Sequence, residues 1–146
     1  MQRAVALAGM VLLWGCGGGG GGGGTPTGPA VLSVGGDYTL GVALTENDCG
    51  AVTVQPLPTH VDHTAGAARL RLTHGPNTFD GSVAADGAFT TDPRTLSDGT
   101  GTLVIAIGGR FTASGMDALA TVTLSRGCRY VVRWTGTKQG TPNVIP

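Results

Sequence analysis

The sequence predicts an all-β domain built as an antiparallel meander, and three observations carry this prediction. Apolar and polar residues alternate with period two in one segment after another, as they do in strands that bury a single face. Glycine, proline and aspartate separate these segments as turn residues would. Helical spacing is absent from the pattern, and Ser114–Ala120 offers at most one helical turn.

The alternation is clearest at Tyr38–Leu44, Ala68–Thr73 and Cys128–Thr135. In the last of these, Cys128, Tyr130, Val132 and Trp134 share one face, and the arginines between them take the other. Further short strands are expected at 52–55, 78–84, 89–91, 103–107, 110–113 and 122–124, with 31–34 as one more candidate.

Three glycine-containing turns are expected between these strands. Asp86-Gly87 stands between two alternating segments and is a strong hairpin signal. Gly108-Gly109 and Arg126-Gly127 are interpreted in the same way. Pro56 and Pro58 end a strand, because proline cannot donate to a ladder, and they open the longest loop, 56–66.

Sequential hairpins favour closure as a small up-and-down β-barrel, which leaves no exposed edges. The alternative is a two-sheet β-sandwich, with the chain changing sheets in the 56–66 loop. The side chains expected to point inward are large enough to fill a barrel of about eight strands. They are Tyr38, Leu40, Val42, Leu44, Val52, Val54, Leu70, Leu72, Phe79, Val83, Phe89, Leu103, Ile105, Ile107, Phe111, Val122, Leu124, Tyr130, Val132 and Trp134.

The N-terminus has the features of a secretion signal. Arg3 supplies a positive charge, and Ala4–Leu13 is an apolar stretch too short to cross a bilayer. The segment Leu13-Trp14-Gly15-Cys16 resembles the lipobox of bacterial lipoproteins. That resemblance implies that residues 1–15 are removed and that Cys16 carries lipid, with palmitate among its acyl chains. The alternative is an ordinary cleaved signal in which Cys16 has no role.

Residues 16–36 are expected to form a flexible tether after the lipidated cysteine. Gly17–Gly24 is a run of eight glycines with no side chain to bury, and Thr25–Pro29 extends it. A single β domain is then expected at 37–138, followed by a C-terminal tail at 139–146.

The domain itself resembles small secreted bacterial lipoprotein domains and, at the level of the fold, lipocalin-like barrels. The matching residues are Tyr38–Leu40, Cys49-Gly50, Gly81–Val83, Gly109–Phe111, Cys128 and Trp134–Gly136. The resemblance implies a cell-envelope protein held on a membrane by its lipid. Gly17 after the cysteine implies the outer membrane if the cell has two membranes. It implies no particular activity.

Three cysteines are present, and lipid on Cys16 would leave Cys49 and Cys128 as a pair. Because an exported domain meets oxidising conditions, we expect a disulfide between them. The alternative is two reduced cysteines beside the core.

Charge gives little indication of a partner. Nine basic and nine acidic residues leave a net charge of zero, which gives no reason to expect binding to nucleic acid. Arg69, Arg71, Arg129 and Arg133 lie on faces opposite the apolar stripes and are expected to form a solvated outer surface rather than an anion-binding patch.

His60, Asp62 and His63 are the metal-ligand candidates, with His74 further along the chain. Their spacing matches no known zinc pattern, so a polar surface loop is expected and no metal or other cofactor. Asp80, Asp86, Asp92 and Asp98 recur every six residues. We interpret them as turn-capping residues rather than calcium ligands.

No catalytic residues are predicted. A nucleophile elbow of the form Gly-x-Ser-x-Gly is missing, and Glu46 is the only glutamate. Two functions remain. The chain is expected to be a structural or protein-interaction domain of the envelope, because its side chains fill the interior. The alternative is a module that binds a small apolar ligand in the barrel or a glycan on its surface.

Overall fold

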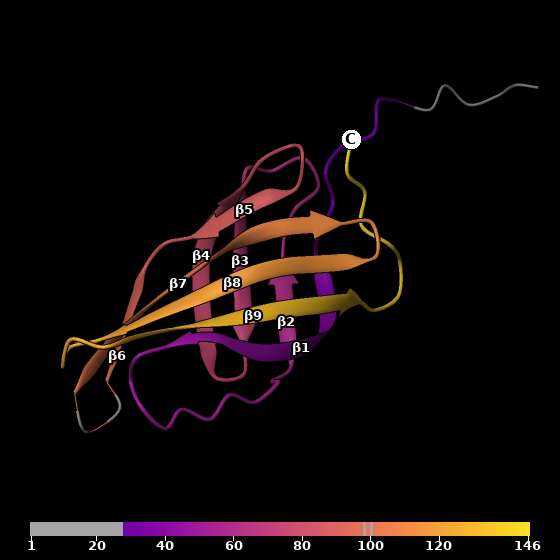
Figure 1. Cartoon of the computed structure of the whole chain (residues 1–146). Helices are drawn as coiled ribbons and strands as arrows, with labels where there is room; N and C mark the ends of the chain where they lie inside the picture. The colour runs from indigo at the N-terminus through magenta and orange to yellow at the C-terminus, as the bar shows by residue number, and fades with distance from the viewer. Residues whose placement is uncertain (1–27, 98, 100) are drawn as a thin grey trace, which may run out of the picture.

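The computed structural model describes residues 28–97, 99 and 101–146, which form nine antiparallel strands and no helix (Figure 1). No helix within these residues is long and apolar enough to cross a membrane. The strands are β1 (Gly36–Asn47), β2 (Thr59–Asp62), β3 (Arg69–His74), β4 (Asn77–Val83), β5 (Ala88–Thr91), β6 (Arg94–Ser97), β7 (Thr102–Thr112), β8 (Gly115–Leu124) and β9 (Arg129–Lys138).

The strands close into a barrel, as the alternation and the turns predict. Neighbouring strands pair in the order β5-β4-β3-β2-β1-β9-β8-β7, and β5 pairs with β7 to complete the ring. β6 pairs only with β7 and lies outside the ring, so eight strands form the barrel. This closure excludes the two-sheet sandwich.

The inward face follows the predicted alternation along every long strand. In β9 the side chains of Val132 and Trp134 are buried, whereas Arg129 and Arg133 are exposed. The buried set that the alternation predicted also includes Tyr38, Leu40, Leu70, Leu72, Phe79, Val83, Phe89, Ile107, Phe111 and Val122.

The prediction of a turn at Gly108-Gly109 is wrong, because both glycines lie within the continuous strand β7. Gly109 pairs with Phe89 on one side and with Ala118 on the other. A Cβ at Gly109 would lie 2.1 Å from the Asp117 carbonyl oxygen, so this glycine permits a close approach of strands and not a reversal of the chain. Ser114–Ala120, which offered at most one helical turn, contains none, since Gly115–Leu124 is strand β8.

Replacing Gly109 with alanine is expected to destabilise the barrel by about 1–3 kcal/mol or more, because the new methyl group meets backbone atoms that cannot move independently. Gly108→Ala is the matched control, since a Cβ there has its nearest contact at 3.6 Å. That control should change the free energy of unfolding by less than about 1 kcal/mol. Urea unfolding of both variants measures the difference, and equal losses would contradict this account of Gly109.

The strands next to Pro56 and Pro58 also differ from the prediction. Residues 52–55 form no strand, and β2 lies at Thr59–Asp62, inside the expected 56–66 loop. β6 was not predicted, and residues 31–34 contribute only one bridge, between Ser33 and Val144. The Asp86-Gly87 and Arg126-Gly127 turns are confirmed, with Gly87 and Gly127 at φ 84° and 88°.

One end of the barrel is sealed by the two segments that flank the strands. Leu32 and Val34 precede β1 and Asn143 follows β9, and all three are buried. The Tyr38 hydroxyl lies 2.7 Å from the Val34 carbonyl oxygen and 2.8 Å from the Asn143 Oδ1. The Asn143 Nδ2 donates to the Thr112 carbonyl oxygen at 2.8 Å. The packed core therefore extends beyond the expected 37–138 range on both sides.

Candidate functional site

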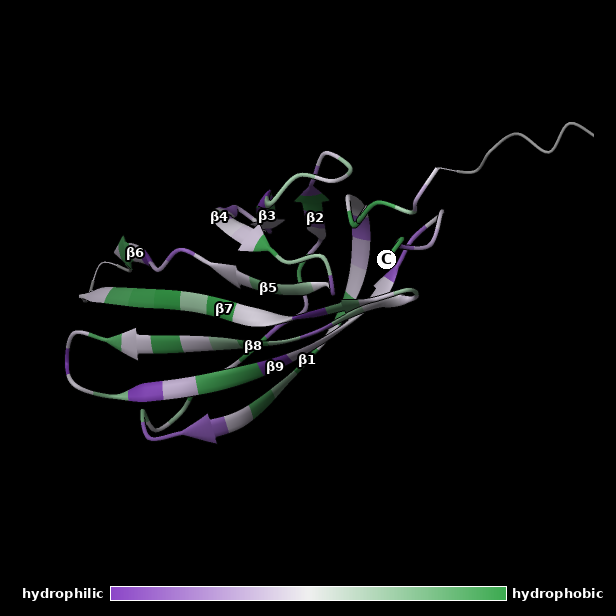
Figure 2. Cartoon of the chain, turned by 90° about the horizontal axis from the view of Figure 1, so that it is seen from above, coloured by the Kyte–Doolittle hydropathy of each residue, from purple (hydrophilic) through white to green (hydrophobic). Residues whose placement is uncertain are grey.

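The end of the barrel opposite the seal is half open. Exposure of the inward side chains rises along β1, from Tyr38 at 3% through Leu40 at 5% to Leu44 at 36%. Along β7, Phe111 and Ile107 are buried, whereas Ile105 and Leu103 are partly exposed. Figure 2 shows the reason: β7, β8 and β9 run on past the shorter strands β2–β5.

The two prolines explain why the wall is incomplete here. β2 pairs with β1 only at Gly36, Asp37 and Tyr38. Because Pro56 and Pro58 have no N–H, the chain before β2 cannot continue this ladder. Among the described residues, no backbone hydrogen bond joins 51–57 to β1. The rest of β1 is therefore held by β9 alone, and the 48–58 segment crosses this side of the barrel without strand pairing.

The half-open end encloses a hollow of about 140 Å³. Its lining is mostly apolar and draws on β1, β3, β4, β7, β8, β9 and the 48–58 segment. The lining residues are Val42, Val54, Gln55, His74, Asn77, Phe79, Ile105, Ala120, Val122, Tyr130, Val132 and Trp134. The hollow is smaller than the several hundred cubic ångströms typical of sites for drug-sized ligands.

His74 is the most constrained polar group in this lining. Its ring stacks on Trp134 with 4.3 Å between ring centroids. Its Nδ1 lies 2.8 Å from the Thr59 Oγ1, and that hydroxyl donates to the Leu57 carbonyl oxygen at 3.1 Å. Because the Thr59 hydroxyl gives its one proton to the Leu57 carbonyl oxygen, the hydrogen bond between Thr59 Oγ1 and His74 Nδ1 needs a proton on Nδ1. Nε2 is then the unprotonated acceptor, and burial keeps the pKa of His74 below its usual range.

Sequence reasoning named His74 only as a distant metal candidate, and its packing role was missed. The signal was present, because the alternation that buries Leu70 and Leu72 in β3 puts His74 on the same face.

The three metal-ligand candidates do not meet at one point, because His60 and Asp62 contact each other whereas His63 points elsewhere. His60 is exposed on β2, with Nδ1 2.6 Å from the Asp37 Oδ1 and Nε2 3.3 Å from the Asp62 Oδ1. His63 turns the other way, and its Nε2 lies 2.8 Å from the Ala67 carbonyl oxygen. Each imidazole is thus engaged by protein groups.

We expect His60 and His74 to titrate on opposite sides of pH 6.5. The hydrogen bond that His60 donates to the Asp37 carboxylate raises the pKa of His60, whereas burial lowers the pKa of His74. The His60 contribution to stability is therefore present below pH 6.5 and is lost as the pH rises through its folded-state pKa. The His74 contribution is present above pH 6.5 and is lost as the pH falls through its folded-state pKa. Imidazole resonances followed by NMR measure both, and a shared midpoint would contradict the assignment.

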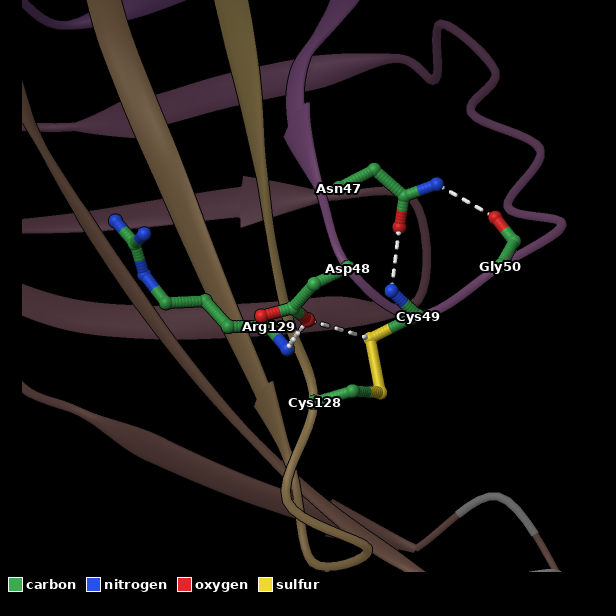
Figure 3. Close-up of a disulfide and its surroundings, with 6 residues drawn as sticks. All are labelled: Asn47, Asp48, Cys49, Gly50, Cys128 and Arg129. Atoms are coloured by element: carbon green, nitrogen blue, oxygen red, sulfur yellow. Dashed lines mark hydrogen bonds between the residues drawn. A yellow bond between two sulfur atoms is a disulfide. The ribbon is translucent and has the colours of Figure 1, made fainter.

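The predicted disulfide joins Cys49 to Cys128 at the half-open end, with 5.1 Å between the Cα atoms (Figure 3). The Asp48 backbone N–H donates to the Arg129 carbonyl oxygen at 3.0 Å, and the Asp48 carboxylate accepts from the Arg129 backbone N–H. Asp48, Cys49 and Cys128 form a cluster of ligand-type atoms. Both sulfurs are committed to the disulfide, so neither is a thiolate ligand.

The four arginines expected on the outer face are each paired with a carboxylate. Arg69 contacts Asp92, Arg71 contacts Asp80, Arg129 contacts Glu46 and Arg133 contacts Asp117, at 2.7–3.2 Å. They form no bare cationic patch. Asp86 caps its turn by accepting from the Ala88 N–H, as predicted, but Asp80 lies inside β4.

Cys16 and the rest of the expected leader lie outside the described residues, as does Asp98. No family model, curated protein or solved structure matches this chain.

Proposed function

We propose that this chain is a lipid-anchored protein of the cell envelope whose barrel is a non-catalytic interaction domain for an envelope protein partner. The observation that carries the proposal is the filled interior. Among the described residues, nineteen hydrophobic side chains are buried, and the hollow at the half-open end measures only about 140 Å³. The surface that remains for a macromolecular partner is the outside of the barrel.

The outer wall of β7, β8 and β9 supports this role. Val104 and Leu119 are 39% and 49% exposed, and Ala106 lies between them on the same face. Val131 faces outward by alternation with Val132 and yet is buried. We call Val104, Ala106 and Leu119 the outer patch. Thr121, which pairs with Ala106 and Val131, lies beside them on the same face.

Charge pairs border the outer patch. Leu119 stands opposite Arg133, which is paired with Asp117, and Val131 follows two residues after Arg129, which is paired with Glu46. Exposed apolar side chains next to polar and charged ones are a common feature of protein interfaces. This pattern favours a protein partner over a glycan.

The anchor is supported by the lipobox-like segment, the glycine run and the disulfide, which suits an oxidising compartment. Two or more acyl chains would hold the protein on a membrane. We expect protein purified from native cells to exceed the mass of the 16–146 chain by the mass of its acyl groups. Cys16→Ser should abolish that excess, and fractionation of a two-membrane cell should place the native protein in the outer membrane. An unmodified, freely soluble native protein would contradict the anchor.

Photo-crosslinking in native cells tests the interaction role. A photoreactive residue at Leu119 should yield one discrete protein adduct. The same residue at Ser82, which is exposed on β4 on another side of the barrel, is the matched control and should yield none. A second variant that also carries Val104→Asp should lose the Leu119 adduct. Equal adducts from both positions would refute a partner on the outer patch.

A further inference from the structure

The hollow beside Trp134 has no part in the proposed interaction with a protein partner, yet it is large enough for a small molecule and contains a polar group. Its volume of about 140 Å³ is close to that of a closed cavity of about 150 Å³ that binds benzene in another protein, but this hollow is open at its mouth. One six-membered ring therefore fits, and a drug-sized molecule does not. Phe79, Tyr130 and Trp134 offer aromatic surface to such a ring.

The polar group that the proposal uses is the imidazole of His74, although Gln55, Asn77 and Tyr130 also bring polar atoms to the lining. Its Nδ1 is committed to Thr59, so its Nε2 is the acceptor. No hydrogen-bond partner of Nε2 is found among the described residues. Among the described residues, every fully buried side-chain nitrogen or oxygen has a hydrogen-bond partner. Because Nε2 has no partner, it is accessible to solvent. A free acceptor in a mostly apolar lining favours a ligand that brings one donor.

The lining contains no charged side chains, and this disfavours the binding of ions. None of the twelve lining residues is an aspartate, glutamate, lysine or arginine. The nearby Arg94 lies 5.8 Å from the centroid of the Phe79 ring, and its guanidinium already donates to the Thr78 carbonyl oxygen. An anion or cation entering the hollow would lose its hydration without gaining a counter-ion.

We propose that the hollow is a binding site for one small, neutral, ring-sized molecule that carries a hydrogen-bond donor, of which phenol is the simplest. The ring lies among Trp134, Tyr130 and Phe79, and the donor reaches the His74 Nε2. Entry is from the half-open end, where the 48–58 segment is not paired to β1. The site is separate from the outer patch, so a failure of the Leu119 crosslink leaves it unaffected.

Fluorescence of Trp134 reports occupancy directly. The chain has two tryptophans, so Trp14→Phe in the full chain leaves Trp134 as the only one. Titration with phenol should give a saturable change. Toluene, which has the same shape without the donor, should bind about three- to tenfold more weakly, as expected for one hydrogen bond. Benzoate should give no saturable change.

Substitutions locate the ligand. His74→Leu should reduce phenol affinity to that of toluene in the same variant, because it removes the acceptor. Ala120→Leu and Val42→Phe fill the hollow from two strands and should each abolish binding of both molecules. Thr121→Leu is the matched control, because it adds the same side chain on the outer face next to Ala120, and it should bind as the parent does. A cooperative thermal transition and an intact disulfide establish that each variant is folded.

Three results would overturn the proposal. The first is the absence of any saturable response to phenol. The second is phenol binding that survives in a folded filling variant, which would place the ligand elsewhere. The third is equal affinity for phenol and toluene that His74→Leu does not change, which would remove the role of the donor.

Discussion

Replacing Trp134 with alanine is expected to lower the free energy of unfolding by about 3–5 kcal/mol, as for other large buried aromatic residues. Trp134 is only 4% exposed and stacks on His74. It lies in β9, which pairs with β1 on one side and β8 on the other, so its loss opens a cavity between well-packed strands. A domain of this size has a total stability of only about 5–15 kcal/mol, so this loss removes a large share of it.

Arg133→Ala is the control for this prediction. Arg133 neighbours Trp134 in β9, but its side chain is 59% exposed and makes one surface pair with Asp117. Its removal should cost less than about 1 kcal/mol. Urea unfolding followed by circular dichroism gives both values. Similar losses for the two variants would mean that the inward and outward faces of β9 are assigned wrongly.

Removing the disulfide is expected to have the second large effect. The bridge joins residues 79 positions apart, so it restricts a long loop of the unfolded chain. In the chain-entropy model such a loop corresponds to about 4 kcal/mol of stability. We therefore expect the double variant Cys49→Ala, Cys128→Ala to lose about that amount. The same loss should follow reduction of the unchanged protein.

Chemical unfolding with and without reductant measures the effect of the bridge. Cys16→Ser is the matched control, because it removes the remaining cysteine and should leave the free energy of unfolding unchanged. Thiol titration of the unfolded, unreduced Cys16→Ser chain should find no free sulfhydryl. Two free thiols, or a loss below about 1 kcal/mol in the double variant, would contradict the role given to this bridge.

The sequence predicted the barrel well where local rules and tertiary packing agree. Alternation placed Leu70 and Leu72 inside β3 because a strand that buries one face must repeat every two residues. Asp86-Gly87 was identified because a reversal there requires a positive φ, which glycine adopts readily.

Prediction failed where a residue's role depends on strands distant in the sequence. Gly109 was interpreted as a turn, and only the approach of β8 explains why a side chain is excluded there. β2 and the gap before it arise because Pro56 and Pro58 interrupt pairing with β1, a partner whose position the local sequence does not reveal. The hollow was not predicted for the same reason, since its size depends on strands of unequal length that meet around the barrel.

The sealed end is also the end at which the N-terminal segment joins the barrel. The chain enters β1 through Leu32 and Val34, and Ser33 is bridged to Val144 at that same end. A protein held by Cys16 would therefore be attached through its closed base, and its half-open mouth and the Cys49–Cys128 bridge would lie at the end far from the tether. A solute would reach the mouth from the aqueous side, and a pull on the anchor would load the Ser33–Val144 contact before it strained the barrel.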